Sequence, residues 1–313
     1  MRLVCPICGH RGDHRLVEMC NGFTLLHCKA CDVVFSEPMR GLDVIQHEQA
    51  YACRNVGTRG SSHLTPNARF FLRRKPHSGG ALLDIGCGDG FFLKQAQRHY
   101  DAFGIDIDRE AIKAATYKHG VAGVAAISVE EFVRRYPDRR FDTVTLFEVL
   151  EHVEDPSGLV RCIRGLLKPE GSLVLSVPNR SRKYASRDPI DRPPNHLSRW
   201  SAEAVEQFLH RNGFRVNRLH QWKTDWFGFF EMEWTIISRF SKVTGPLIRL
   251  CQKKRSVFYK NNLIETYDDT VVSTLVRTLI MKTSQLLWFP LYPFFLLARR
   301  PSFNLYVEAS LEA

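Results

Sequence analysis

The chain has 313 residues, of which 44 % are hydrophobic and 25 % charged, which excludes a disordered, a fibrous or a polytopic membrane protein. Its net charge of +11 predicts an anionic partner: a nucleic acid, a phosphorylated substrate or an acidic membrane surface. The first residues lack a basic-then-apolar export segment, so we expect a cytoplasmic protein whose nine cysteines stay reduced and available to metals.

Two CxxC pairs mark residues 1–35. Cys5 and Cys8 form the first pair, Cys28 and Cys31 form the second, and 19 residues separate the pairs. Four thiolates at this spacing can hold one Zn²⁺ tetrahedrally, which leaves no position for water or substrate. We therefore expect a zinc ribbon with a structural metal; a redox-active CxxC is the weaker alternative.

A regular alternation of elements follows the ribbon. Residues 36–80 predict a helical connector, and residues 81–222 alternate short apolar runs with amphipathic stretches. The apolar runs predict strands at 81–85, 101–107, 141–147, 171–178 and 215–222. The amphipathic stretches predict helices over 91–99, 157–167 and 202–212. This pattern is typical of an open, doubly wound α/β sheet, which binds ligands at the carboxyl ends of its strands.

A glycine-rich loop follows the first of these strands. It reads Gly86-Cys-Gly88-Asp-Gly90, and glycines at such a turn let a ligand approach the backbone closely. A dinucleotide fingerprint would require a glycine where Phe91 stands, so the loop favours a smaller nucleoside with a charged amino-acid tail. Asp106 ends the next strand, where a carboxylate can accept hydrogen bonds from both ribose hydroxyls.

Together these features resemble the class I S-adenosylmethionine-dependent methyltransferases, over residues 81–222 and the last strand. The matching stretches are LLDIGCGDG (82–90), GIDID (104–108), FDTVTLFEVLEHVEDP (141–156) and LLKPEGSLVLSVPN (166–179). The resemblance implies a Rossmann-like, seven-stranded, doubly wound sheet and S-adenosylmethionine as cofactor. It also implies a cofactor-binding set of Asp84, Gly86, Cys87, Gly88, Gly90, Asp106, Ile107, Ser128, Val129, Phe147 and Glu148.

The resemblance also assigns roles within this set. Asp84 and Gly86 are expected near the methionine end of the cofactor, and Asp106 at its ribose. Ser128 is expected to border the adenine, although the family usually carries an Asp near this position. With its CxxC pairs, the whole chain resembles a bacterial subgroup that has an N-terminal zinc ribbon and a VLEHV box. Many members of that subgroup modify surface sugars or other secondary products.

Two histidines are candidate general bases. His152 follows the strand at 141–147 and His196 lies in a Pro-rich loop after the strand at 171–178. A histidine titrates near cellular pH, so either can remove a proton from an acceptor. An equally good interpretation of His152 is that it starts a helix and packs the loop. A metal site of Glu148, Glu151 and His152 is disfavoured, because a helix would not turn all three side chains to one point.

The basic stretch 180–199 and the basic, aromatic segment 223–300 leave two interpretations each. The stretch 180–199 predicts either phosphate recognition or a solvated loop. Segment 223–300 predicts a helical cap, which either packs as a second core or dimer face or lies on the inner membrane surface. No apolar run reaches the ~20 residues of a spanning helix. Residues 301–313 are expected to add the final core strand and a tail.

The leading hypothesis is a methyltransferase that acts on a small or lipid-linked anionic acceptor in glycan or secondary-product biosynthesis. An rRNA or tRNA methyltransferase with ribbon-mediated RNA contact is an alternative. It is disfavoured because Phe147-Glu148-Val149 replaces the Asn/Asp-Pro-Pro-aromatic box and no RNA-binding module is recognisable. A non-catalytic, cofactor-binding interaction protein is the third hypothesis. The sequence fixes neither the acceptor atom nor the oligomeric state.

Overall fold

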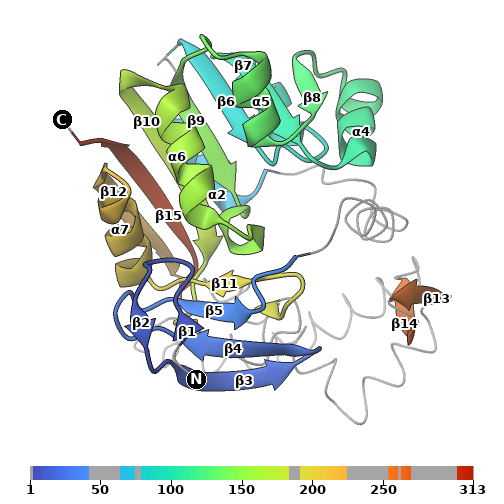
Figure 1. Ribbon diagram of the computed structural model, residues 1–313. Coiled ribbons are helices and arrows are strands. Elements are labelled where there is room, and N and C mark those ends of the chain that lie inside the picture. The colour runs from blue at the N-terminus through green and yellow to red at the C-terminus, as the bar shows by residue number, and fades with distance from the viewer. Residues whose placement is uncertain are drawn as a thin grey trace, which may run out of the picture. The chain divides into compact units, whose positions relative to one another are not determined.

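The computed structural model describes residues 3–41, 64–74, 79–182, 191–223, 253–259, 262–268 and 302–312. The chain divides into two compact units. The first unit holds Met1–Tyr51, Gly60–Trp222 and Phe303–Ala313, so the cysteine-rich segment and the α/β core share one unit (Figure 1). The second unit holds Ala52–Arg59 and Lys223–Ser302.

The first unit begins with short strands and continues with alternating helices and strands. In the N-terminal part these are β1 (Leu3–Val4), β2 (Arg11–Gly12), β3 (Arg15–Cys20), β4 (Phe23–His27), β5 (Val34–Glu37) and α2 (Pro66–Arg74). The core continues with β6 (Ala81–Ile85), α3 (Phe91–Ala96), β7 (Asp101–Asp106), α4 (Arg109–His119), β8 (Val124–Ala126), α5 (Val129–Arg135) and β9 (Phe141–Phe147). It closes with the 3-10 helix η1 (Leu150–His152), α6 (Pro156–Leu166), β10 (Leu167–Pro178), β11 (Ser198–Arg199), α7 (Ala202–Arg211), β12 (Phe214–Lys223) and β15 (Ser302–Leu311).

The central sheet has seven strands in the order β12-β15-β10-β9-β6-β7-β8. The neighbours from β8 to β10 run parallel, and β15 pairs antiparallel with β10. The strand order reverses beside β6, so the carboxyl ends of β6 and β9 flank the position where doubly wound sheets bind ligands. The predicted Rossmann-like, seven-stranded fold is confirmed.

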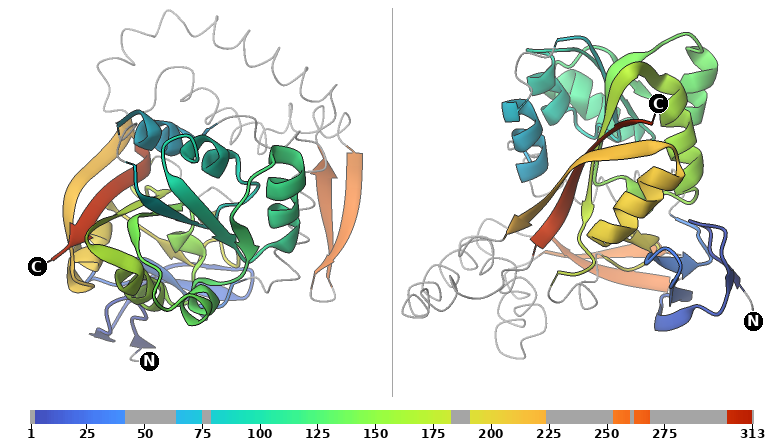
Figure 2. Two further views of the ribbon diagram at one scale, coloured as in Figure 1. Left: turned by 90° about the horizontal axis from the view of Figure 1, so that it is seen from above. Right: turned by 90° about the vertical axis from the view of Figure 1, so that its left-hand side faces the viewer.

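Helices cover both faces of this sheet (Figure 2). Neighbouring strand residues point to opposite faces, so Leu82 packs in the cluster with residues of α2, α3 and α4, whereas Leu83 packs with residues of α5, α6 and α7. Tyr306 and Val307 of β15 divide between the faces in the same way. The uninterrupted apolar runs in the sequence reflect this burial on both sides.

Polar side chains fix where several helices begin. Asp108 accepts hydrogen bonds from the amides of Glu110 and Ala111 at the start of α4. Ser128, Asp155 and Ser201 cap α5, α6 and α7 in the same manner. Each cap satisfies an amide that the helix itself leaves unpaired, which is worth about 1 kcal/mol.

A second sheet joins the cysteine-rich segment to the core. Its order is β11-β5-β4-β3, and β11 comes from the loop that follows β10. Ser198 pairs with Phe35 and Arg199 with Val34, and the amide of Ser36 donates to the carbonyl of Leu197 at 2.8 Å. The ribbon segment therefore continues into the core through backbone hydrogen bonds, which the sequence analysis does not anticipate.

The described part of the second unit is a hairpin of β13 (Lys253–Tyr259) and β14 (Asn262–Asp268). A helical cap was expected over 223–300, and that expectation is wrong for these two strands. The alternating run KKRSVFY pairs antiparallel with NLIETYD, which the basic and aromatic composition of the segment obscured. The rest of the predicted cap, and residues 42–63 and 75–78 of the predicted connector, lie outside the described residues. No helix among the described residues is long and apolar enough to cross a bilayer.

Candidate active site

The glycine loop between β6 and α3 adopts a backbone that only glycine accommodates easily. Gly86, Gly88 and Gly90 have φ values of 74°, 53° and 74°. A Cβ on Gly86 would lie 2.4 Å from Cγ2 of Val149, so the segment after β9 contacts the loop directly. A Cβ on Gly88 would meet nothing within 4 Å, so the backbone there faces open space. A ligand can therefore approach the loop closely at Gly88.

The amides of the loop hold it against β7. Gly86 and Cys87 both donate to the carbonyl of Ile105, at 2.8 and 3.1 Å, and Gly88 donates to Oδ2 of Asp106 at 2.9 Å. These three hydrogen bonds fix the loop and orient the carboxylate of Asp106. A ligand can therefore approach the backbone of the loop closely, and the loop holds the carboxylate of Asp106 in position beside it.

Asp106 presents its half-buried carboxylate at the end of β7. Its Oδ1 accepts from the amide of Asp108 at 2.9 Å, and each oxygen can accept a further hydrogen bond. Ile107, the next residue, is 39 % exposed, so an apolar side chain lies beside this carboxylate. A carboxylate for ribose hydroxyls next to an apolar surface for a base fits an adenosyl group.

Two predicted cofactor residues have buried side chains. Asp84 accepts a hydrogen bond from Oγ1 of Thr145 at 2.7 Å, and burial, with a smaller effect of the charge on Asp106, raises the pKa of Asp84 to about 7. The thiol of Cys87 lies against Gly104, and burial raises its pKa. These two buried side chains help to hold the glycine loop in place.

Four further predicted cofactor residues have structural roles in or near the loop. Ser128 caps α5 through its hydroxyl, and Val129 is buried. Phe147 packs edge-on against Phe92 with ring centroids 5.1 Å apart. Gly90 lies so close to α4 that a Cβ would come within 2.8 Å of Cβ of Ala115.

Glu148 occupies a strained backbone position after β9, with φ of 58°. Its Oε1 accepts from Oγ of Ser176 at 2.7 Å and from Nδ2 of Asn304 at 3.2 Å. These hydrogen bonds tie the ends of β9, β10 and β15 together. Burial raises the pKa of this carboxyl, and the hydrogen bond from Ser176 opposes the rise.

The two candidate bases meet although 43 residues lie between them in the chain. The rings of His152 and His196 contact edge to face, with centroids 4.7 Å apart. His152 Nδ1 lies 2.6 Å from the carbonyl oxygen of Asn195, and His196 Nδ1 lies 3.1 Å from Oδ1 of Asp191. Burial alone would raise the pKa of Asp191, but hydrogen bonds from His196 and Arg182 lower it. A carboxylate thus orients the buried imidazole of His196.

Glu151 lies beside this histidine pair. Its side chain is 1 % exposed, and its Oε1 lies 4.0 Å from Nε2 of His152. Among the described residues neither carboxylate oxygen has a hydrogen-bond partner. Burial, and then repulsion from Glu148, raise the pKa of Glu151 well above its usual range. A metal site of Glu148, Glu151 and His152 was disfavoured on helical geometry. In the structure η1 is a single 3-10 turn, and the residue that meets Glu151 and His152 is His196.

The described arginines of the basic stretch 180–199 pair with carboxylates inside the protein. Arg182 lies 2.6 Å from Oδ2 of Asp191. The other pairs are Arg180 with Asp32, Arg192 with Glu18, and Arg199 with Glu18. Three of these four pairs connect the core to the cysteine-rich segment. Phosphate recognition by these four side chains gains no support, and Lys183 and Arg187 lie outside the described residues.

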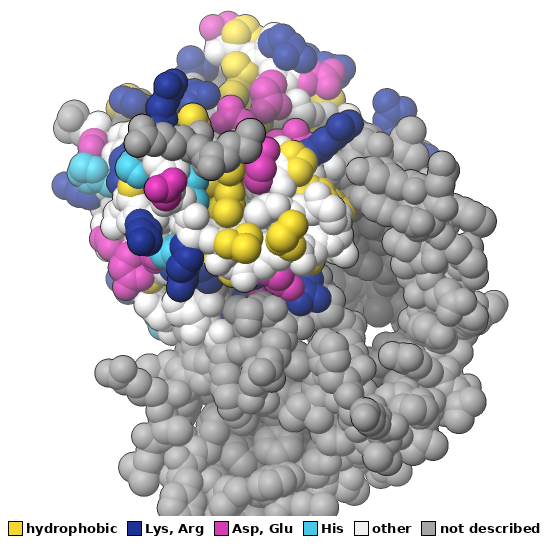
Figure 3. Space-filling model, turned by 60° about the horizontal axis from the view of Figure 1, so that its bottom comes forward, with side chains coloured by type: hydrophobic (Ala, Val, Ile, Leu, Met, Phe, Trp, Pro, Cys, Tyr) yellow, Lys and Arg dark blue, Asp and Glu magenta, His cyan; other side chains and the backbone are white. Residues whose placement is uncertain are grey.

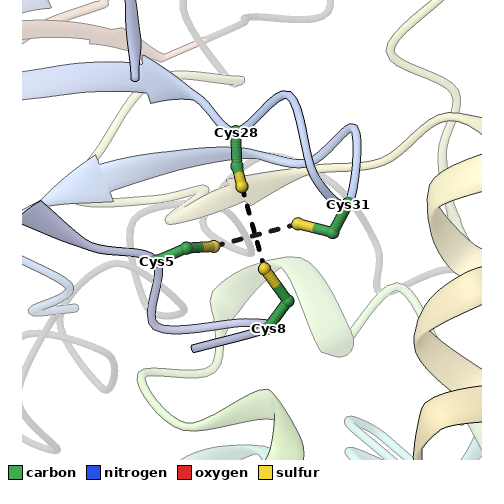
Figure 4. Close-up of side chains that lie close together, drawn as sticks. All are labelled: Cys5, Cys8, Cys28 and Cys31. Carbon is green, nitrogen blue, oxygen red and sulfur yellow. Dashed lines mark hydrogen bonds between the residues drawn. The ribbon is translucent and has the colours of Figure 1, made fainter. Parts of the chain in front are cut away.

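The four predicted metal-binding cysteines converge on one point (Figure 4). Sγ of Cys5 lies 3.8 Å from Sγ of Cys31, and Sγ of Cys8 lies 3.7 Å from Sγ of Cys28. A tetrahedral site with Zn–S bonds of about 2.3 Å separates its sulfurs by roughly 3.8 Å. The residues present therefore fit Zn²⁺.

The turn after each CxxC pair has a left-handed residue, Gly9 with φ of 73° and Asp32 with φ of 58°. Asp32 is the less favourable residue there, but its carboxylate accepts hydrogen bonds from His27, Arg180 and Ser201. Because Arg180 and Ser201 belong to the core, the second cysteine turn is fixed directly to the loop that carries His196.

Sequence reasoning missed Asp191 and Asn195, which orient the two histidines, and it missed that Glu151 meets His196. A Glu-His pair after one strand and an Asn-His pair after the next, at the same edge of a parallel sheet, was the signal that could have indicated the meeting. The contacts between side chains of these loops depend on the backbone pairing of β11 with β5. A strand of two residues leaves no periodic pattern in the sequence, so this pairing could not be predicted.

Comparisons with known proteins agree with this architecture. A family model described as "Methyltransferase domain" matches residues 59–219, which is 161 of the 313 residues. The "Ubiquinone biosynthesis O-methyltransferase" of Pseudomonas aeruginosa is 38 % identical over 111 residues, which are 34 % of this chain and 47 % of the relative. The chain thus spans about half the length of the curated relatives it matches.

Two solved structures share the fold. The [4+2]-cyclase SpnF superposes with a TM-score of 0.52 at 14 % identity, over 88 % of this chain and 98 % of that chain. Phosphoethanolamine N-methyltransferase 2 of Haemonchus contortus, solved with S-adenosyl-L-methionine, superposes with a TM-score of 0.50 at 16 % identity, over 85 % of this chain and 57 % of that chain. At these identities the likeness concerns the fold alone.

Proposed function

Because the chain belongs to the methyltransferase-domain family of S-adenosylmethionine-dependent enzymes, we propose that it transfers a methyl group to a hydroxyl of a small molecule. One observation carries this proposal: the glycine loop and the histidine pair lie at the same edge of the sheet and are joined by the contact of Gly86 with Val149. The printed name of the Pseudomonas aeruginosa relative, an O-methyltransferase, favours oxygen as the acceptor atom.

The residues of this chain supply binding and orientation for such a transfer. S-adenosylmethionine supplies an activated methyl group when bound. Asp106 would accept hydrogen bonds from the ribose, Ile107 would cover the base, and the open backbone at Gly88 would leave room for the amino-acid tail. The methyl transfer is an in-line displacement, so the protein accelerates it mainly by aligning the two reactants and excluding water.

The histidine pair is placed to handle the acceptor proton. His152 donates through Nδ1–H to a carbonyl, which can only accept, so its neutral ring carries the lone pair on Nε2. His196 donates to Asp191 in the same way, which also leaves its lone pair on Nε2. Both imidazoles therefore present a basic nitrogen beside the end of β9.

Other parts of the sequence hypothesis stay predictions. The four described arginines of 180–199 do not support an anionic or lipid-linked acceptor, because each of them pairs with a carboxylate of the protein. Contact with a membrane surface depends on segment 223–300, most of which lies outside the described residues. We also propose that the cysteine cluster holds a structural Zn²⁺, supported by its sulfur separations of 3.7 and 3.8 Å.

The described residues on one face of the protein give no support to RNA methylation. On the face seen in Figure 3, dark blue Lys and Arg side chains of the described residues are interspersed with magenta Asp and Glu side chains. A continuous basic surface would be the electrostatic footprint of a nucleic-acid partner. An acceptor of low molecular mass is therefore favoured.

Calorimetric titration with S-adenosylmethionine tests the cofactor part of the proposal. Wild type should bind, and Asp106→Ala should lose at least tenfold in affinity because the ribose hydroxyls lose their acceptor. Asp101→Ala is the matched control, since Asp101 begins the same strand at an exposed position and should leave binding unchanged. Absence of binding by folded wild type would contradict the proposal.

The acceptor is then sought by mass spectrometry. Folded protein with S-adenosylmethionine is incubated with panels of phenols, catechols, sugars and amines, and methylated products are recorded. Methylation confined to hydroxyl compounds is the expected result. Products methylated on nitrogen alone would contradict the choice of oxygen while leaving the cofactor site intact.

A further inference from the structure

We propose that Glu151, His152 and His196 bind a divalent transition-metal ion next to the glycine loop. One ligand atom from each of the three lies within 4.8 Å of the other two. The binding itself is independent of the proposed methyl transfer. Only the role of the ion in the reaction, given below, rests on that proposed function.

The buried carboxylate of Glu151 is the first argument. It is 1 % exposed, and neither oxygen has a hydrogen-bond partner among the described residues. Buried polar groups are nearly always paired, because leaving a carboxylate without a partner costs several kcal/mol. A cation between Glu151 and the two imidazoles would satisfy both oxygens at once.

The orientation of the histidines is the second argument. A metal-bound histidine usually donates its other ring N–H to a carboxylate or a backbone carbonyl, which fixes the ring and makes it a better ligand. His152 makes this hydrogen bond to the carbonyl of Asn195, and His196 makes it to Asp191. Asp191 is held in turn by Arg182 and, through its backbone carbonyl, by Arg199. Both supporting groups of a two-histidine metal site are thus in place.

The spacing is the third argument. Metal–ligand bonds of about 2.1 Å put neighbouring ligand atoms roughly 3.0–3.4 Å apart. Nε2 of His152 and Oε1 of Glu151 are 4.0 Å apart, so small side-chain rotations would bring them onto one ion. Because η1 is one short turn bounded by loops, such rotations need no change in a regular element.

The donor set indicates the class of metal. Two imidazoles and one carboxylate suit Mn²⁺, Fe²⁺, Co²⁺ or Zn²⁺, and three protein ligands leave positions open for water or substrate. The cysteine cluster differs in both respects, since its four thiolates favour Zn²⁺ and close the coordination shell. The two sites therefore differ in metal preference and can be loaded separately.

An open position next to the cofactor gives the ion a role in the proposed reaction. An acceptor hydroxyl bound there loses its proton to water at a lower pH than in solution. Its oxygen then forms a bond to the methyl carbon while the carbon–sulfur bond breaks, and the sulfur keeps the electron pair of that bond. The two histidines act as ligands in this scheme, and the ion takes over the task of a general base.

Titration of Mn²⁺ into the full, zinc-replete chain, followed by electron paramagnetic resonance of the free ion, tests the site. Mn²⁺ binds weakly to thiolates, so it reports the nitrogen and oxygen ligands alone. We expect one Mn²⁺ per chain in wild type. Glu151→Gln and His196→Gln should each lose at least tenfold in affinity. Glu154→Gln is the matched control, because Glu154 is an exposed carboxylate three residues away and should bind as wild type does.

Folding and cofactor binding are measured on the same variants. Glu151→Gln replaces a buried carboxyl group without a partner among the described residues by an amide of similar shape, so it should fold about as stably as wild type and should keep its affinity for S-adenosylmethionine. Asp106→Ala should show the reverse, with Mn²⁺ bound and the cofactor affinity reduced, so failure of the metal site and failure of the proposed function are distinguishable. Wild type that binds neither Mn²⁺ nor Zn²⁺ beyond the equivalent in the cysteine cluster overturns the proposal. Binding that survives both Glu151→Gln and His196→Gln also overturns it.

Discussion

At the scale of single residues, the candidate active site is built around carboxylates in three different environments. Asp106 is half-buried and hydrogen-bonded by two amides, Asp84 is buried with one hydroxyl donor, and Glu151 is buried without a partner among the described residues. Burial without full pairing favours the protonated form, whereas hydrogen bonds to the anion favour the charged form. Burial accordingly raises the pKa of Asp84 and of Glu151.

Asp84 should make the stability of the ligand-free protein depend on pH. The pKa of Asp84 in the folded protein is about 7, above its usual value of 3.8, so between these two pH values the folded state binds more protons than the unfolded state. Its contribution to stability is fully present below about pH 4 and is lost as the pH rises through about 7. Urea unfolding of wild type and Asp84→Asn across this range should show wild type losing stability relative to the variant. Asp101 is exposed and nearby, so the stability of Asp101→Asn should change with pH as that of wild type does. A stability difference between Asp84→Asn and wild type that is constant with pH would contradict the prediction.

At the scale of elements, the sequence predicted the regular core well. The runs at 81–85 and 141–147 form strands with these bounds, because apolar residues buried on both faces leave few alternatives. Short or irregular elements were not predicted: η1 has three residues and β11 has two, so neither produces a periodic pattern. The hairpin of β13 and β14 was taken for helix because its charged and aromatic residues dominate the composition. Of these elements, β11 depends on a distant part of the chain, because it pairs with β5.

The close approach of the glycine loop to the turn after β9 predicts unequal costs for two alanine substitutions. Gly86 and Gly88 both have a left-handed backbone conformation, so alanine at either position introduces a similar backbone strain. Gly86→Ala adds a clash with Val149, whereas Gly88→Ala meets nothing within 4 Å. Gly86→Ala should therefore lower the free energy of unfolding by roughly 1–3 kcal/mol more than Gly88→Ala. If denaturant titrations gave the same loss of unfolding free energy for both variants, Val149 would be able to move aside without cost.

At the scale of the whole molecule, the cysteine cluster and the candidate active site belong to one connected structure. Asp32 joins the second cysteine turn to Arg180 and Ser201, and Glu18 joins β3 to Arg192 and Arg199. The sequence predicted the ribbon and the core separately, since each has its own motif. It could not predict that they share a sheet, because contacts between distant charged residues follow no periodicity.

This connection predicts that disruption of the cysteine cluster affects the loop with His196 more than it affects the cofactor site. Cys5→Ser should leave the affinity for S-adenosylmethionine within about twofold of wild type, because the glycine loop is held by β7. The same variant should lower Mn²⁺ affinity and methyl transfer at least tenfold, since the loop with His196 loses its support. Calorimetry and the manganese titration provide the two readouts, with Cys20→Ser as the matched control. Equal losses at both sites would indicate general unfolding.

The pairing of β11 with β5 also bears on how far this chain can be shortened. Removal of residues 1–41 would uncover the backbone donors and acceptors of β11 and would leave Arg180, Arg192 and Arg199 without their carboxylate partners Asp32 and Glu18. An uncovered strand edge is a template for pairing with other chains. A truncated protein that keeps every residue of the seven-stranded sheet should therefore self-associate, so the smallest unit that folds on its own is expected to include residues 1–41.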